Sequence, residues 1–198
     1  LKPKALFVLD LGVMDQELLP GAPTVFIDHH RPFGHPPGAI VASSYGSTPS
    51  PPTTYVTWEV LSRVSSLAPR HAHPGHGAPP DISDLSWLCA VGTAGDMGTD
   101  FVLAGADGER AGAPKLKKRD VADAEVLINS AKRASAYDIE TAIGLLDEAK
   151  GLADLVDQDS PLVARLQDYR REVNEEVKRC RHEKPSFLWR VAVIPFKS

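Results

Sequence analysis

The chain has few cysteines, no long apolar run and no excess of positive charge. Its two cysteines among 198 residues, Cys89 and Cys180, lie far apart and are interpreted as reduced thiols, which argues against a disulfide framework. No segment is long and apolar enough to span a bilayer, and the N-terminus does not resemble a signal peptide, so we expect a cytoplasmic protein. The formal net charge of −4 argues against a chain-wide basic surface for nucleic acid, although a local groove stays compatible with it.

The composition and the apolar patterns are those of a globular α/β protein. Hydrophobic residues make up 42% and charged residues 24%, as in ordinary soluble domains. Short apolar runs predict parallel strands over residues 5–9, 24–27 and 40–42, the first of them fully buried. Helical spacing predicts helices over 55–67, from a cap at Asp81 or Ser83 to about 91, and over 117–134, 136–149 and 160–182. A last strand is predicted over 187–196. We therefore expect a parallel sheet flanked by helices, a helical connector, and the start of a second domain.

Acidic and imidazole side chains follow two of the predicted strands. Asp10 ends the first strand, and Asp28, His29 and His30 follow the second. Open α/β sheets bind ligands at the carboxyl ends of their strands, so we expect Asp10 and His29 at the same edge. Asp96 is expected in a glycine-rich turn after a helix, where small residues let the backbone approach a site. Carboxylate and imidazole together suit Mn²⁺, Zn²⁺ or Fe²⁺, which indicates a metal-dependent hydrolase.

Other candidate residues have simpler interpretations. The three histidines of a Pro/Gly-rich stretch, His71, His73 and His76, are interpreted as solvated loop residues, because nothing there fixes the geometry of a metal site. His35 is likewise interpreted as a loop residue. In the helix over 136–149, the apolar face is predicted to carry Ile139, Ile143 and Leu146.

Three ordered segments resemble the second, third and fourth motifs of the DHH phosphoesterase superfamily. These segments are Leu9-Asp10-Leu11-Gly12, Asp28-His29-His30 and Ala90-Val91-Gly92-Thr93-Ala94-Gly95-Asp96-Met97. A further stretch, residues 128–133 followed by Asp138 and residues 142–146, is similar to the segment after the catalytic core in RecJ-like members. The resemblance covers roughly residues 5–150.

The resemblance implies hydrolysis of phosphodiester bonds with two divalent metal ions, which would be Mn²⁺, with Mg²⁺ or Co²⁺ as other possibilities. Asp10 would bridge the two ions, and His29 and Asp96 would complete the ligands of one of them. His30 would contact the scissile phosphate or assist proton transfer. Asp28 would accept an imidazole N–H and so fix the tautomer of that ring.

The implied substrates are single-stranded nucleic acids or nucleotides, with Asn129 and Arg133 contacting substrate phosphate. The first motif of the family, His-x-Asp-x-Asp, has no match before Asp10. The resemblance therefore implies a fragment without full activity: a partial catalytic domain over 1–112, a helical region over 113–184 that closes it and connects onward, and the first strand of a truncated C-terminal domain over 185–198. Two alternatives stay open, a hydrolase of polyphosphate or small nucleotides and a non-catalytic scaffold with the same fold. The oligomeric state is not predicted.

Overall fold

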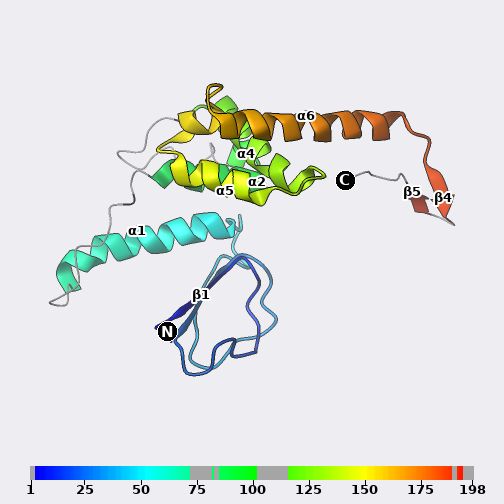
Figure 1. Ribbon diagram of the computed structural model, residues 1–198. Coiled ribbons are helices and arrows are strands. Elements are labelled where there is room, and N and C mark those ends of the chain that lie inside the picture. Colours follow the sequence, from blue (N-terminus) through cyan, green and yellow to red (C-terminus); the bar gives the residue numbers. More distant parts are fainter. Residues whose placement is uncertain (1–2, 72–81, 83–84, 102–115, 189–190, 194–198) are drawn as a thin grey trace. The chain divides into compact units, whose positions relative to one another are not determined.

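The computed structural model describes residues 3–71, 82, 85–101, 116–188 and 191–193. The chain forms two compact units, Leu1–Lys115 and Leu116–Ser198. The first unit combines a parallel sheet with helices, and the second is built mainly from helices (Figure 1). The α/β class that the sequence predicts is thus confirmed. Among the helices of the described residues, none combines the length and the apolar character needed to cross a membrane.

A three-stranded parallel sheet organises the first unit. Its strands are β1 (Leu6–Leu9), β2 (Thr24–Asp28) and β3 (Ile40–Ser43), in the order β1-β2-β3. The register places Val8 opposite Phe26, and Phe26 opposite Val41. Val8 and Phe26 form a small core with Val13, a residue of the connection that follows β1. The three predicted parallel strands are therefore confirmed.

The expectation that the first strand is fully buried is wrong. Within β1 only Val8 is buried, whereas Phe7 is 63% and Leu9 46% exposed. Successive side chains of a strand point to opposite faces of the sheet, so Val8 and the partly buried Leu6 face the core, whereas Phe7 and Leu9 face away from it. A continuous apolar run shows that both faces tolerate apolar residues, but it does not show that both faces are covered.

Helix α1 (Thr53–His71) follows the sheet and packs against β2 and β3, and it also contacts α2 (Ser86–Met97). A short helical turn, α3 (Thr99–Phe101), comes next. Gly92 permits the close approach of the two longer helices, because a Cβ at this position would lie 2.6 Å from Cγ2 of Thr54. The predicted caps of the second helix, Asp81 and Ser83, lie outside the described residues, and α2 begins after Leu85.

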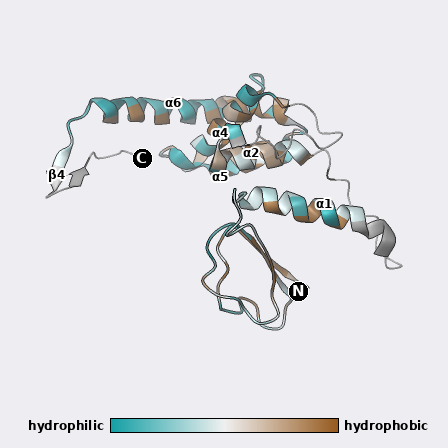
Figure 2. Ribbon diagram, turned by 180° about the vertical axis from the view of Figure 1, so that it is seen from behind, coloured by the Kyte–Doolittle hydropathy of each residue, from teal (hydrophilic) through white to brown (hydrophobic). Residues whose placement is uncertain are grey.

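The second unit consists of helices α4 (Lys118–Arg133), α5 (Ile139–Glu148) and α6 (Pro161–His182), with the 3₁₀ helix η3 (Leu152–Val156) between the last two. Its core includes buried residues of α4, η3 and α6, namely Val121, Ala124, Leu127, Leu155, Val163 and Leu166, and α5 adds Ala142 and Leu145. Ser160 caps α6, and Pro161 occupies its first turn. Hydrophilic residues predominate along α6 (Figure 2), where Arg179 pairs with Glu176 one turn before it. These three predicted helices are confirmed within one to three residues.

The prediction that Ile143 belongs to the apolar face of α5 is wrong, whereas Ile139 and Leu146 are partly buried. In α5 the buried face carries Thr141, Ala142 and Leu145, whereas Ile143 is 52% exposed. Asp138 caps α5 and also accepts a hydrogen bond from Tyr169 of α6, at 2.7 Å, so a polar contact that apolar spacing cannot reveal helps to orient this helix.

The single strand expected over 187–196 is instead a pair of short antiparallel strands. These are β4 (Ser186–Leu188) and β5 (Val191–Val193), paired so that Leu188 lies opposite Val191. The sequence does not indicate that the chain reverses between these strands, because it contains no Asn-Gly or similar turn signal there.

Candidate metal centre

Asp10 lies at the carboxyl end of β1, just beyond the last paired residue of the strand. Its N–H donates to the carbonyl oxygen of Ile27 at 3.2 Å, so the chain stays paired with β2 up to this point. Its backbone has a φ of 61°, in the left-handed region that Asp and Asn enter more readily than most residues. The side chain of Asp10 is 53% exposed and is therefore accessible to a ligand from solvent.

His29 and His30 follow β2 directly and reach the same edge of the sheet. His29 Nε2 lies 3.4 Å and His30 Nδ1 lies 3.8 Å from Oδ1 of Asp10. Asp10, His29 and His30 each offer one ligand atom, and these atoms all lie within 4.8 Å of one another. Parallel pairing of Leu9 with Ile27 explains this convergence, because it brings the residues that follow both strands to one edge. A carboxylate and an imidazole at this spacing, with a second imidazole close by, fit a divalent cation such as Mn²⁺ or Zn²⁺.

Asp28, the last residue of β2, holds the loops after β1 and β2 together. It is only 1% exposed. Its Oδ2 accepts a hydrogen bond from the N–H of Gly12 at 2.7 Å, and its Oδ1 accepts from the N–H of His30 at 2.5 Å. One buried carboxylate thus satisfies a backbone N–H from each loop, which fixes the two loops relative to each other.

Asp28 also selects the tautomer of the neutral His30 ring. Burial by itself raises the pKa of the Asp28 carboxyl, but the hydrogen bonds from Gly12 and His30 outweigh burial and place this pKa below its usual value. The carboxylate is therefore ionised at neutral pH and can only accept hydrogen bonds. Since His30 Nδ1 lies 3.0 Å from Oδ1 of Asp28, Nδ1 carries the proton, and Nε2 of the neutral ring is left with a free lone pair.

The two loops make further close contacts. Phe33 N–H donates to the carbonyl oxygen of Val13 at 2.7 Å. At the neighbouring Gly34, a Cβ would lie 1.3 Å from Oδ1 and 2.8 Å from the backbone nitrogen of Asp15. Glycine is needed here because the other loop occupies the space of a side chain. The segment that carries the two imidazoles is therefore packed tightly against the segment that follows Asp10.

Sequence reasoning missed one residue of this site, Thr53. Its hydroxyl donates to Oδ1 of Asp10 at 2.7 Å. In the sequence, Thr53 lies two residues before the helix predicted over 55–67 and belongs to none of the segments that resemble a known family. The topology could have indicated it, because the chain leaves β3 at the edge where Asp10 lies, and α1 begins ten residues later.

The structure does not place Asp96 with the other predicted ligands. The expectation of a glycine-rich turn is wrong here, because α2 continues through Asp96 to Met97 and ends at Gly98. The small residues before Asp96 belong to a helix that packs closely against α1. Glycine and alanine at these positions therefore do not indicate a turn. In the part of the chain that the structure describes, the ligand atoms within 4.8 Å of one another do not include those of Asp96, which is exposed. Its role as a ligand stays a prediction.

The other candidate residues lie elsewhere. Asn129 and Arg133 belong to α4 of the second unit, where Asn129 donates to Glu125 at 2.5 Å and Arg133 is exposed. Their contact with substrate stays a prediction. His35 is exposed, and the side chains of the histidine-rich stretch, His71 included, lie outside the described residues.

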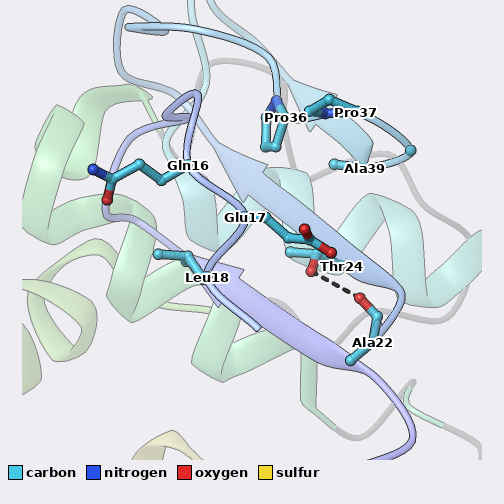
Figure 3. Close-up of a pocket in the computed structure, with 9 residues that line it drawn as sticks. Gln16, Glu17, Leu18, Ala22, Thr24, Pro36, Pro37 and Ala39 are labelled. Atoms are coloured by element: carbon cyan, nitrogen blue, oxygen red, sulfur yellow. Dashed lines mark hydrogen bonds between the residues drawn. The ribbon is translucent and has the colours of Figure 1, made fainter. Parts of the chain in front are cut away.

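A small recess lies at the opposite edge of the sheet (Figure 3). Thr24, the first residue of β2, and Ala39, which precedes β3, both line it, so it belongs to the amino ends of the strands. Its volume of about 30 Å³ has room for roughly one water molecule. Thr24 donates its hydroxyl within this recess to the carbonyl oxygen of Ala22 at 3.3 Å. The recess is therefore separate from the candidate centre and too small for a substrate.

Comparisons with protein-family models, with curated proteins and with solved structures found no match to this chain.

Proposed function

We propose that this protein belongs to the metal-dependent phosphoesterases and that Asp10 and His29 hold a divalent cation at the carboxyl edge of the sheet. The observation that carries the proposal is the convergence of Asp10, His29 and His30, whose ligand atoms lie within 4.8 Å of one another. The order and spacing of the segments that resemble the DHH superfamily support the same chemistry. We favour Mn²⁺, because mixed carboxylate and imidazole ligands suit it.

Each residue then has a distinct task. Asp10 supplies carboxylate oxygens and His29 supplies an imidazole nitrogen to the cation, which when bound stabilises negative charge on a phosphoryl group. His30 is 51% exposed, so a substrate can reach its ring. Because Asp28 holds the proton on Nδ1 of His30, Nε2 is free to accept a proton or to contact the phosphate through its protonated form.

For the substrate we propose a phosphodiester of a nucleotide or a single-stranded nucleic acid. The similarity of residues 128–133 to RecJ-like members supports this class over polyphosphate. The net charge of −4 weakens the case for long polynucleotides, since these are bound chiefly through basic side chains. Short oligonucleotides and nucleotides are therefore the first substrates to test.

The primary experiment measures Mn²⁺ binding, because the resemblance implies that full activity needs a further motif. Free Mn²⁺ is followed by electron paramagnetic resonance in titrations of the wild-type chain and of three variants. We expect Asp10→Asn and His29→Ala to weaken binding by about 10-fold or more. His35→Ala removes an exposed histidine five residues after His30 in the sequence and should bind Mn²⁺ like the wild type.

Hydrolysis is measured beside binding, on a short single-stranded oligonucleotide, a dinucleotide and polyphosphate. Mn²⁺-stimulated cleavage of the first two that Asp10→Asn abolishes supports the proposal. Preferential cleavage of polyphosphate would contradict the proposed substrate class and support the polyphosphate alternative. A wild-type chain that binds no Mn²⁺, or binding that is equal in all four proteins, would refute the metal centre and favour the scaffold alternative.

A further inference from the structure

We infer that Thr53 is a positioning residue of the candidate metal centre, whose hydroxyl orients the carboxylate of Asp10. The inference rests on the proposed function and extends it to a residue outside the segments that resemble a known family. The Oδ1 atom that receives the Thr53 hydroxyl at 2.7 Å is the same atom that lies 3.4 Å from Nε2 of His29. The hydroxyl therefore acts on the face of the carboxylate that meets the imidazole.

Asp10 needs such a partner. Its side chain is about half exposed, so packing does not restrict its rotamers as it would in a core. Its backbone is in the left-handed region, and the chain turns away from the sheet at this residue. A carboxylate in this position would sample several orientations in water unless a hydrogen bond selected one of them. Without that hydrogen bond, the cation would have to restrict the side chain when it binds, and the entropy lost in this step would weaken binding.

Thr53 is well suited to select that orientation. It is the first residue of α1 and is 5% exposed, and its branched Cβ leaves it few rotamers. Backbone hydrogen bonds also fix the start of the helix. The N–H groups of Tyr55 and Val56 both donate to the carbonyl oxygen of Pro52, at 2.9 Å and 3.1 Å. The donor is thus held by the helix before any cation arrives.

The electrostatics of the helix start favour the same arrangement. The N-terminus of a helix carries partial positive charge, and α1 has 19 residues with no acidic residue in its first turn. Asp10, which comes from another element, supplies the negative charge there. A hydroxyl donor occupies only one of the four or so lone-pair positions of a carboxylate and brings no positive charge. Thr53 therefore fixes Asp10 and leaves the carboxylate free to bind a cation.

The experiment compares three substitutions in the full chain. Thr53→Val removes the hydroxyl and keeps the shape of the side chain, and Thr53→Ser keeps the hydroxyl. Thr57→Val makes the same change one helical turn later, where the hydroxyl donates to the backbone carbonyl oxygen of Thr53 and not to Asp10. We expect Thr53→Val to weaken Mn²⁺ binding about 10- to 100-fold. Thr53→Ser should recover most of the wild-type affinity, and Thr57→Val should retain it.

Thermal unfolding without Mn²⁺ separates positioning from stability. A similar fall in affinity for Thr53→Val and Thr57→Val, with lower melting temperatures in both, would show a structural role and overturn the inference. If Thr53→Val does not fold, Thr53→Ala is compared with Thr53→Ser in its place. Unchanged affinity in Thr53→Val beside a loss in Asp10→Asn would refute the role of Thr53 and leave the centre intact. Unchanged affinity in Asp10→Asn as well would refute both.

Discussion

Replacing Asp28 by Asn should lower the free energy of unfolding of the first unit, although the two side chains have nearly the same shape. In the wild type, one carboxylate oxygen accepts from the N–H of Gly12 and the other accepts from the N–H of His30. Asn has one acceptor oxygen, so its NH₂ group must face one of these two N–H groups. The variant therefore leaves a backbone N–H without an acceptor in either orientation of the amide.

The magnitude follows from that loss. Hydrogen bonds to a charged acceptor contribute about 1.5–3 kcal/mol each, and an unpaired buried N–H adds a penalty of its own. Because Asp28 is 1% exposed, water cannot replace the missing acceptor freely. We expect a loss of about 2–3 kcal/mol in the free energy of unfolding, which corresponds to a shift of roughly 1–2 M in the urea midpoint. Circular dichroism in a urea titration at pH 7 measures this shift.

The pH dependence gives a second readout. The pKa of Asp28 is lower in the folded protein than in the unfolded chain, so its contribution is complete above the unfolded value of about 3.9. The contribution is lost as the pH falls through the folded pKa. The difference between wild type and Asp28→Asn should therefore shrink in acid. Asp96→Asn, an exposed carboxyl in the same unit, should change stability by less than about 1 kcal/mol. A variant Asp28→Asn as stable as the wild type at pH 7 would refute this reasoning.

Two further predictions concern contacts between helices. Gly92→Ala should destabilise the first unit by about 1–3 kcal/mol, because the new Cβ would lie 2.6 Å from Cγ2 of Thr54, and the added Thr54→Ser change should restore part of the loss. Equal urea midpoints for Gly92→Ala and wild type would contradict this prediction, because they would show that α1 and α2 can move apart without a loss of stability. Tyr169→Phe should raise the pKa of the Asp138 carboxyl, which hydrogen bonds from Thr141 and then Tyr169 hold below its usual value. A carbon-13 NMR titration measures this pKa, and an unchanged value would contradict the assigned contact.

The elements that local patterns define could be predicted from the sequence. Alternating and continuous apolar runs indicate the three parallel strands, and helical spacing with a Ser160 cap indicates α6. The convergence of Asp10 with His29 was also predictable, because parallel neighbours end at the same edge of a sheet. These inferences need only the order of the residues and the regular geometry of strands and helices.

The remaining features depend on contacts between distant segments. The hydrogen bond of Thr53 to Asp10 joins residues 43 positions apart, and no spacing rule relates them. Small residues before Asp96 are compatible with a turn or with close helix packing, and only the neighbouring α1 decides for the helix. In α5, the polar contact of Asp138 with Tyr169 competes with the apolar pattern that favours Ile143 as a core residue. Tertiary context decided each of these cases.

The candidate metal centre depends on the register in which β1 pairs with β2. A slip of two residues, the smallest that keeps each side chain on its own face, would move one strand by about 6.6 Å along the other. Asp10 would then leave both imidazoles, and Gly12 would leave the Asp28 carboxylate in the same movement. A misregistered sheet would therefore lose the proposed cation site and the loop-to-loop bond together, so that the affinity for Mn²⁺ would report on strand alignment.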